Sequence, residues 1–155
     1  MNTESLNRWL SLAANVGVLI GIVFLAIEIQ QNTEMTRAQI TQGRAEISVA
    51  MAEMNVNSDY LPSIRAKISN SEALTQEEAI RYQNWLRAVF RSQDNNFQQY
   101  KQGLLGEHIP RALAETARDA VVNDPVGRDF WEQSKRMFSD DYIEFVDQLI
   151  AENER

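Results

Sequence analysis

The chain has 155 residues and a formal net charge of −7, a length that fits one domain or an anchor plus one small domain. The acidic charge argues against nucleic-acid binding, which depends on neutralising phosphates, so we expect no nucleic-acid partner. The lack of cysteine excludes disulfides, thiolate metal sites and a cysteine nucleophile. Only three prolines and six glycines are present, which favours helices.

An apolar segment extends from Leu10 to Ile29. About 20 apolar residues at 1.5 Å each are enough to cross a hydrocarbon layer of roughly 30 Å. A soluble helix usually keeps a polar face, but residues 16–27 contain no polar side chain. We therefore predict a membrane-spanning helix over residues 1–31, in contact with lipid and anchored at the interface by Trp9. A cleaved signal peptide is disfavoured because no small-x-small cleavage site follows; a buried core helix is the other alternative.

Small residues recur inside this segment. Ala13, Gly17 and Gly21 are spaced by four and are expected along one side of a helix, where they would let another helix approach closely. Asn15 is expected close to this row, where it would donate a hydrogen bond across the interface. The alternative is that the glycines are ordinary membrane composition and that Asn15 is hydrated. The row predicts a homo-oligomer or a membrane-protein partner.

Glu28 falls near the far end of the segment. We interpret it as an interfacial polar residue, with an intramembrane carboxylate as the alternative. Arg8 precedes the span, whereas Arg37 and Arg44 follow it. Because Lys and Arg concentrate on the cytoplasmic side, this bias predicts a cytoplasmic C-terminal domain.

No proline interrupts residues 30–55, so we expect the first helix to continue without a break from about residue 5 to 54. Ile40, Ile47 and Met54 recur every seven residues, and Met51 occupies an intermediate position of the repeat. This stripe is either a coiled-coil seam between copies or the face on which later helices pack. The short length of the repeat favours packing by the later helices.

Start signals mark the following helices. Ser58 or Asp59 is expected to cap a short helix with Pro62 in its first turn. Thr75 and Glu78 form the pattern of a capping box, which predicts a helix from residue 76 to 102 that Gly103 ends. Two carboxylates after Ser139 predict the start of the last helix.

Apolar side chains recur at helical spacing through residues 64–150. The expected inward positions are Ile64, Ile68, Tyr82, Trp85, Leu86, Val89, Phe90, Gln93, Phe97, Tyr100, Ile109, Leu113, Ala117, Ala120, Val121, Phe130, Trp131, Met137, Phe138, Ile143, Val146 and Ile150. No segment alternates as a strand. The prediction is an all-α fold, in which the N-terminal transmembrane helix continues into an antiparallel helical bundle over residues 32–155.

Few residues suggest chemistry. His108 is the only histidine, so di-iron and Cys/His zinc patterns are excluded. We expect His108 to be solvated or to cap a helix. No phosphate-binding loop or nucleophile motif is present, so we predict no enzyme, no catalytic residue, no metal site and no cofactor. Arg81, Arg87 and Arg91 are interpreted as flanks of a core stripe, with contact to a partner as the alternative.

The segments "ANVGVLIGIVFLAIEIQQNT", "LTQEEAIRYQNW", "FQQYKQGLL" and "GRDFWEQSKRMFSDDYIEFVDQLI" resemble a bacterial family of single-span membrane proteins without assigned function. The likeness covers nearly the whole chain. It implies the same architecture, an N-terminal transmembrane helix and a C-terminal helical domain in the bacterial inner membrane. It implies no catalytic or cofactor residue.

Three functional hypotheses follow. The first is a non-enzymatic membrane-anchored module that self-associates or docks onto a larger membrane complex. The second is a small homo-oligomeric channel lined by the first helix, with Asn15 and Glu28 as polar rings. The third is a ligand-sensing bundle, which predicts a pocket lined by Tyr82, Trp85 or Trp131.

Overall fold

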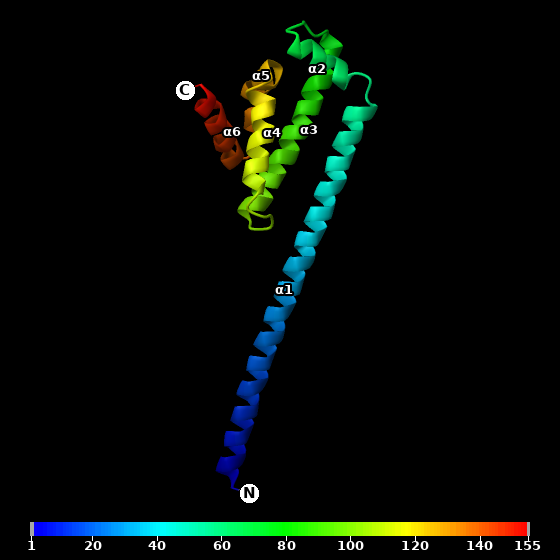
Figure 1. The fold of residues 1–155 in the computed structure, drawn as a ribbon. Helices are drawn as coiled ribbons and strands as arrows, with labels where there is room; N and C mark the ends of the chain where they lie inside the picture. Colours follow the sequence, from blue (N-terminus) through cyan, green and yellow to red (C-terminus); the bar gives the residue numbers. More distant parts are fainter. Residues whose placement is uncertain (1, 155) are drawn as a thin grey trace. The chain divides into compact units, whose positions relative to one another are not determined.

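The first helix is the longest element of the chain. A computed structural model describes residues 2–154, and in it α1 runs unbroken from Thr3 to Asn57 (Figure 1). This range contains no proline, the strongest helix breaker. The hydroxyls of Thr33, Thr36 and Thr41 donate to carbonyls four residues earlier at 2.8–2.9 Å, so they compete little with the helix. The predicted continuity of the first helix is confirmed.

The chain divides into two units after Arg44. The first unit holds most of α1, and the second holds the last turns of α1 together with the later helices. This division separates groups of contacting residues. The predicted boundary after residue 31 concerns the membrane and stays a prediction.

The later helices of the second unit follow one another with short connections. They are α2 (Leu61–Ser69), α3 (Gln76–Lys101), α4 (Ile109–Val121), α5 (Pro125–Ser134), the 3-10 helix η1 (Lys135–Met137) and α6 (Asp140–Asn153). The neighbouring helices α3 and α4 run antiparallel, and α4 also contacts α5 and α6 (Figure 1). Residues 2–154 contain no strand, and the all-α prediction is confirmed.

The start of α3 agrees with its sequence signal. The Thr75 hydroxyl accepts from the Glu78 N–H at 3.2 Å, and the Glu78 carboxylate accepts from the Thr75 N–H at 2.8 Å. These bonds are the predicted capping box, which satisfies backbone donors that a helix start leaves unpaired. At the other end Gly103 has φ +72°, a left-handed conformation that glycine adopts without a Cβ clash.

The predicted cap of α2 is wrong. Its N-cap is Tyr60, which makes no side-chain capping bond, and Pro62 lies in the first turn. A proline fits only the first turn of a helix, so Pro62 sets the start next to Leu61. Ser58 and Asp59 therefore lie upstream of the helix and do not cap it.

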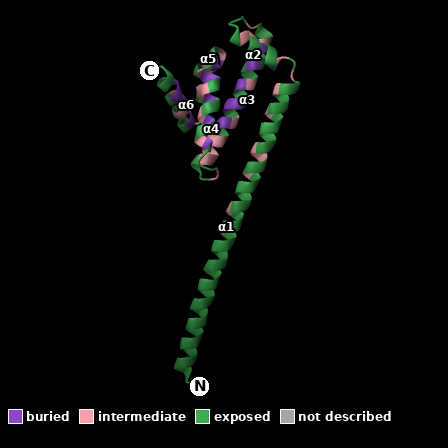
Figure 2. Ribbon diagram, viewed as in Figure 1, coloured by how far each residue is buried: buried purple, intermediate pink, exposed green. Residues whose placement is uncertain are grey.

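The buried residues of the second unit lie on its helices (purple in Figure 2), and many of them are aromatic. Trp131 and Tyr142 are fully buried. Their polar atoms have partners, since Trp131 Nε1 donates to Asp147 at 2.8 Å and the Tyr142 hydroxyl donates to Gln93 at 2.9 Å. Burial raises the pKa of Tyr142, and the Asp94 carboxylate adds to that rise.

Most inward positions predicted from spacing are buried, and five others are half-buried: Ile68, Trp85, Phe97, Tyr100 and Ile143. Met137 and Tyr142 differ from the prediction. Met137 is 43% exposed, because the tighter 3-10 turn of η1 changes the register before Phe138, which is buried. Tyr142 was not predicted and lies at the centre of the core. In the last turns of α1, Ile47 and Met54 are each 44% exposed, whereas Met51 between them is half-buried, so the later helices cover this part of the heptad stripe only in part.

One glycine permits a close helix crossing. Gly127 lies in α5, and a Cβ atom added there would overlap the carbonyl oxygen of Ala120 in α4. Backbone cannot yield as a flexible side chain does, so only glycine allows this approach. Gly127 therefore has a packing role between α4 and α5.

Candidate functional site

The apolar part of α1 is the first candidate site. Within residues 2–154, α1 alone is long and apolar enough to cross a membrane by length and composition, and none of its residues is buried (Figure 2). Trp9, the predicted interfacial anchor, is 70% exposed. The segment therefore offers its whole circumference to lipid or to another helix.

Ala13, Gly17 and Gly21 lie along one side of α1, as their spacing predicts for a continuous helix. A Cβ atom added at Gly17 or Gly21 would meet nothing within 4 Å. The backbone at both glycines is thus open to close approach by another helix. That they serve association stays a prediction.

Asn15 does not share this face, which corrects the sequence interpretation. Residues two positions apart in an α-helix lie about 160° apart around its axis, so Asn15 and Gly17 point to nearly opposite sides of α1. Asn15 instead continues a polar stripe that contains Glu4, Arg8 and Ser11. A partner that packs on Gly17 would not reach it.

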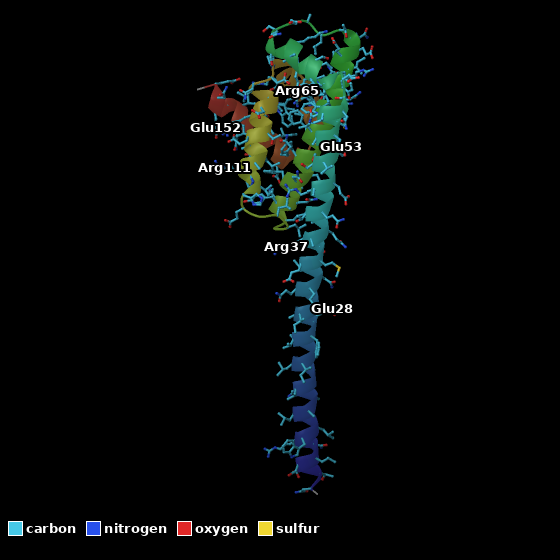
Figure 3. The ribbon with its side chains drawn as sticks, turned by 45° about the vertical axis from the view of Figure 1, so that its right-hand side comes forward. Glu28, Arg37, Glu53, Arg65, Arg111 and Glu152 are labelled. Carbon is cyan, nitrogen blue, oxygen red and sulfur yellow. The ribbon has the colours of Figure 1, made fainter. Side chains whose placement is uncertain are left out.

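Glu28 lies on the side of the glycines. It follows Gly21 by seven residues and Gly17 by eleven, and both spacings bring side chains within about 20° on a helix. The side chain is labelled with Arg37 along α1 in Figure 3. Glu28 and Asn15 are about 140° apart around the axis, so they cannot both line one narrow face of a straight helix.

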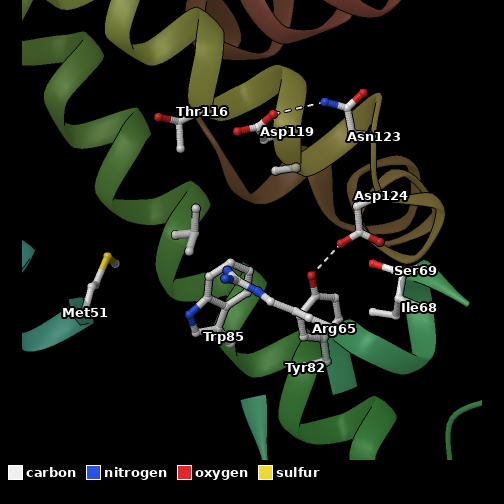
Figure 4. Close-up of a pocket in the computed structure, with 12 residues that line it drawn as sticks. Met51, Arg65, Ile68, Ser69, Tyr82, Trp85, Thr116, Asp119, Asn123 and Asp124 are labelled. Atoms are coloured by element: carbon white, nitrogen blue, oxygen red, sulfur yellow. Dashed lines mark hydrogen bonds between the residues drawn. The ribbon is translucent and has the colours of Figure 1, made fainter. Parts of the chain in front are cut away.

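A pocket in the second unit is the other candidate site (Figure 4). Its volume is about 400 Å³, which falls in the range of roughly 300 to 1,000 Å³ for small-molecule sites. The lining residues are Met51, Arg65, Ile68, Ser69, Tyr82, Trp85, Val89, Thr116, Asp119, Ala120, Asn123 and Asp124. A pocket lined by Tyr82 and Trp85 was predicted, whereas Trp131 belongs to the core.

Aromatic rings from α3 form one wall of the pocket. The rings of Tyr82 and Trp85 stack with centroids 5.4 Å apart. The Arg65 guanidinium of α2 lies 4.5 Å from the centre of the Trp85 ring, where the negative face of the indole attracts a cation. This contact holds a positive charge against the pocket wall although the Arg65 residue is exposed.

Acidic and amide groups line the opposite side, at the end of α4. Asp119 is exposed and accepts a hydrogen bond from the Asn123 amide at 3.0 Å. Asp124 is buried, and its two oxygens accept from the Tyr82 hydroxyl at 2.5 Å and from the Val126 N–H at 2.9 Å. Burial, together with this bond to Asp124, raises the pKa of Tyr82. The Tyr82–Asp124 pair therefore holds α3 against the start of α5 and leaves Asp119 as the accessible carboxylate.

Sequence reasoning found the aromatic wall but missed Arg65 and Asp119. The aromatics share one helix and recur at core spacing. Arg65 and Asp119 come from other helices. In the sequence, nothing distinguishes either of them from an ordinary exposed charged residue. The three arginines of α3 do flank a core stripe: Arg81 pairs with Glu77 at 2.6 Å, and Arg87 and Arg91 lie over Phe130 and Phe138.

Neither candidate site presents a metal centre. In the part of the chain that the structure describes, no three acidic or histidine side chains gather in a possible metal site. His108 is exposed at the start of α4 and makes no capping bond, in agreement with a solvated histidine. Comparisons with family models, curated proteins and solved structures find no match to the chain.

Proposed function

We propose that the chain is a single-pass membrane protein whose second unit is a helical binding module. One observation carries this proposal. Nine large apolar side chains between Val16 and Ile27 are 46–68% exposed, and burying one such side chain completely is worth about 1.5–3 kcal/mol. An aqueous setting would leave this surface unfavourably hydrated, whereas a bilayer solvates it.

The proposed setting is the bacterial inner membrane, with the C-terminal module in the cytoplasm. The resemblance noted above supports the membrane, and the excess of Arg37 and Arg44 over Arg8 supports the orientation. A protease added to sealed vesicles of known orientation tests it. Cleavage of the second unit only in inside-out vesicles is expected, and cleavage only in right-side-out vesicles would reverse the assignment.

We further propose that the module acts by binding and self-associates through the side of α1 that carries Ala13, Gly17 and Gly21. The hydrophobic effect does not drive helices together inside lipid, so association depends on van der Waals packing between them. Small residues favour this packing because they let the two backbones approach closely. Glu28 lies at the end of this side. Two copies paired in parallel would bring like charges together there, which opposes tight pairing at that end.

The mass of the full-length protein in lipid nanodiscs tests association. We expect a dimer or larger species that Gly17→Leu or Gly21→Leu shifts toward the monomer. Ala26→Leu is the matched control, because Ala26 lies about 180° from Gly17 and the change also enlarges a small residue. A monomeric wild type, or equal effects of Gly17→Leu and Ala26→Leu, would remove the glycine side from the proposal.

The channel is the second candidate function, and helix geometry disfavours it in its two-ring form. Asn15 and Glu28 face different sides of α1, so one pore could be lined by only one of them. Conductance in planar bilayers separates the hypotheses. Conductance that Glu28→Gln alters and Asn15→Ala does not would support a Glu28-lined pore in place of a binding module.

A further inference from the structure

The pocket of the second unit carries two charges of opposite sign without ionic partners. In the described chain, neither Arg65 nor Asp119 forms a salt bridge. Arg65 lies on the aromatic wall from α3, and Asp119 belongs to the α4 side (Figure 4). The pocket is therefore dipolar, with a cation on one wall and an anion on another.

Each charge keeps bonding capacity for a ligand. A guanidinium has five N–H donors in a planar fork that matches a carboxylate, and the stacking on Trp85 limits how far Arg65 can swing away. The Asp119 carboxylate has about four acceptor positions, and the Asn123 amide uses one. Asp124 is buried, and each of its oxygens already accepts a bond from a protein donor, so Asp119 is the carboxylate that a ligand can reach.

Much of the remaining lining is apolar and suits a hydrophobic side chain. Met51, Ile68, Val89 and Ala120 line the pocket together with the Trp85 ring. The Thr116 hydroxyl donates to its own helix at the Ala112 carbonyl. A complementary molecule would thus join a carboxylate, an ammonium group and an apolar body.

We propose that this pocket binds a small zwitterion with an apolar side chain, a free amino acid or a short peptide, whose carboxylate meets Arg65 and whose ammonium meets Asp119. Ligand pockets commonly combine an apolar lining with a few placed polar groups, as here. The inference does not depend on whether α1 crosses a membrane.

Calorimetric titration of the full-length protein in nanodiscs tests the proposal with L-phenylalanine and L-leucyl-L-phenylalanine. We expect one of them to bind with a Kd below about 1 mM. The stronger probe distinguishes an amino acid from a dipeptide. The N-acetyl derivative lacks the ammonium and the amide derivative lacks the carboxylate, so each should bind at least about ten-fold more weakly.

Substitutions then test which side chain binds each charged end of the ligand. Arg65→Gln and Asp119→Asn should each weaken binding, and the amide derivative should lose no further affinity with Arg65→Gln, because the two changes remove one interaction. Arg111→Gln and Asp129→Asn are matched controls at exposed positions outside the pocket. Circular dichroism checks that the variants fold.

Several results would overturn the proposal. They are a lack of binding by both probes at millimolar concentration, binding of the N-acetyl derivative as tight as that of the parent, and a loss of binding in the control variants equal to that in the pocket variants. Tight binding of the N-acetyl form would identify a simple anion site at Arg65.

Discussion

The apolar part of α1 and the core of the second unit use similar side chains in opposite surroundings. Trp131 is fully buried among other rings, whereas Trp9 is 70% exposed. Val146 is buried, whereas Val23 is 58% exposed. The helices of the second unit bury their apolar side chains against one another, whereas the apolar part of α1 leaves its side chains exposed. The composition of an apolar helix therefore does not show whether its side chains are buried in a protein core. The contacts around the helix show it.

The largest expected effect separates the two tryptophans. Trp131→Ala should lower the free energy of unfolding of the second unit by about 3–5 kcal/mol, because it leaves a cavity in the core and removes the donor to Asp147. Trp9→Ala should change it by less than about 0.5 kcal/mol. Urea unfolding of the full chain in mild detergent, followed by near-ultraviolet circular dichroism, measures both. Equal losses would contradict the structural separation of the two regions.

A charge placed in the apolar segment of α1 tests whether lipid surrounds this segment. Val23→Arg should oppose insertion by about 2.5–3.5 kcal/mol, the penalty for arginine near the middle of a spanning helix. Val56→Arg is the matched control, since Val56 is 81% exposed on the same helix but beyond the apolar run. The measurement is the share of protein that stays in the membrane pellet after an alkaline carbonate wash. Equal retention of both variants would favour an aqueous setting for residue 23.

Local signals predicted much of the fold. The capping box at Thr75, the left-handed Gly103 and the helical spacing of Leu86, Phe90 and Trp131 are properties of short stretches of sequence, and the structure confirms them. Tyr142 is followed at helical spacing by Val146, Leu149 and Ile150, and these four are the buried residues of α6. The spacing therefore held the signal for Tyr142, and the prediction missed it because it chose the neighbouring Ile143, which is only half-buried. The position of Met137 depends on a 3-10 turn, which its own apolar character does not indicate.

The candidate sites divide in the same way. Ala13, Gly17 and Gly21 follow from one helix, and so does the correction for Asn15, which needed only the angle between successive residues. Arg65 and Asp119 come from separate helices, so their place in one pocket emerges only after the chain has folded. The sequence thus predicts which faces a helix has, but not which charges from other helices will lie opposite them.

The capping box offers a smaller test within the second unit. Thr75→Ala should destabilise the bundle by about 1 kcal/mol, because it leaves the Glu78 N–H without its acceptor. Thr116→Ala is the control, because the Thr116 hydroxyl bonds within α4 and caps nothing. Neither change should alter membrane retention. A loss at Thr116 equal to that at Thr75 would show that the effect is not capping.

The smallest expected effect is a pH dependence confined to the second unit. The hydrogen bond from Lys67 and the backbone bond from Thr75 lower the pKa of Glu78 from 4.5 to about 2. A carboxyl group whose pKa is lower when folded stabilises the folded state fully above its unfolded pKa. That contribution should therefore be present above about pH 4.5 and should fade as the pH falls toward about 2.

Glu78→Gln isolates this contribution, since glutamine can still accept the Thr75 N–H as a capping-box residue but cannot pair as an anion with Lys67 at 2.7 Å. Unfolding curves of wild type and variant should differ at neutral pH and converge as the pH falls below about 4.5. Glu77→Gln, which removes the exposed pair with Arg81, is the neighbouring control. A gap between wild type and Glu78→Gln that persisted near pH 2 would assign the difference to packing instead of charge. Membrane retention should be the same for all three proteins near neutral pH, because these residues lie outside the apolar part of α1.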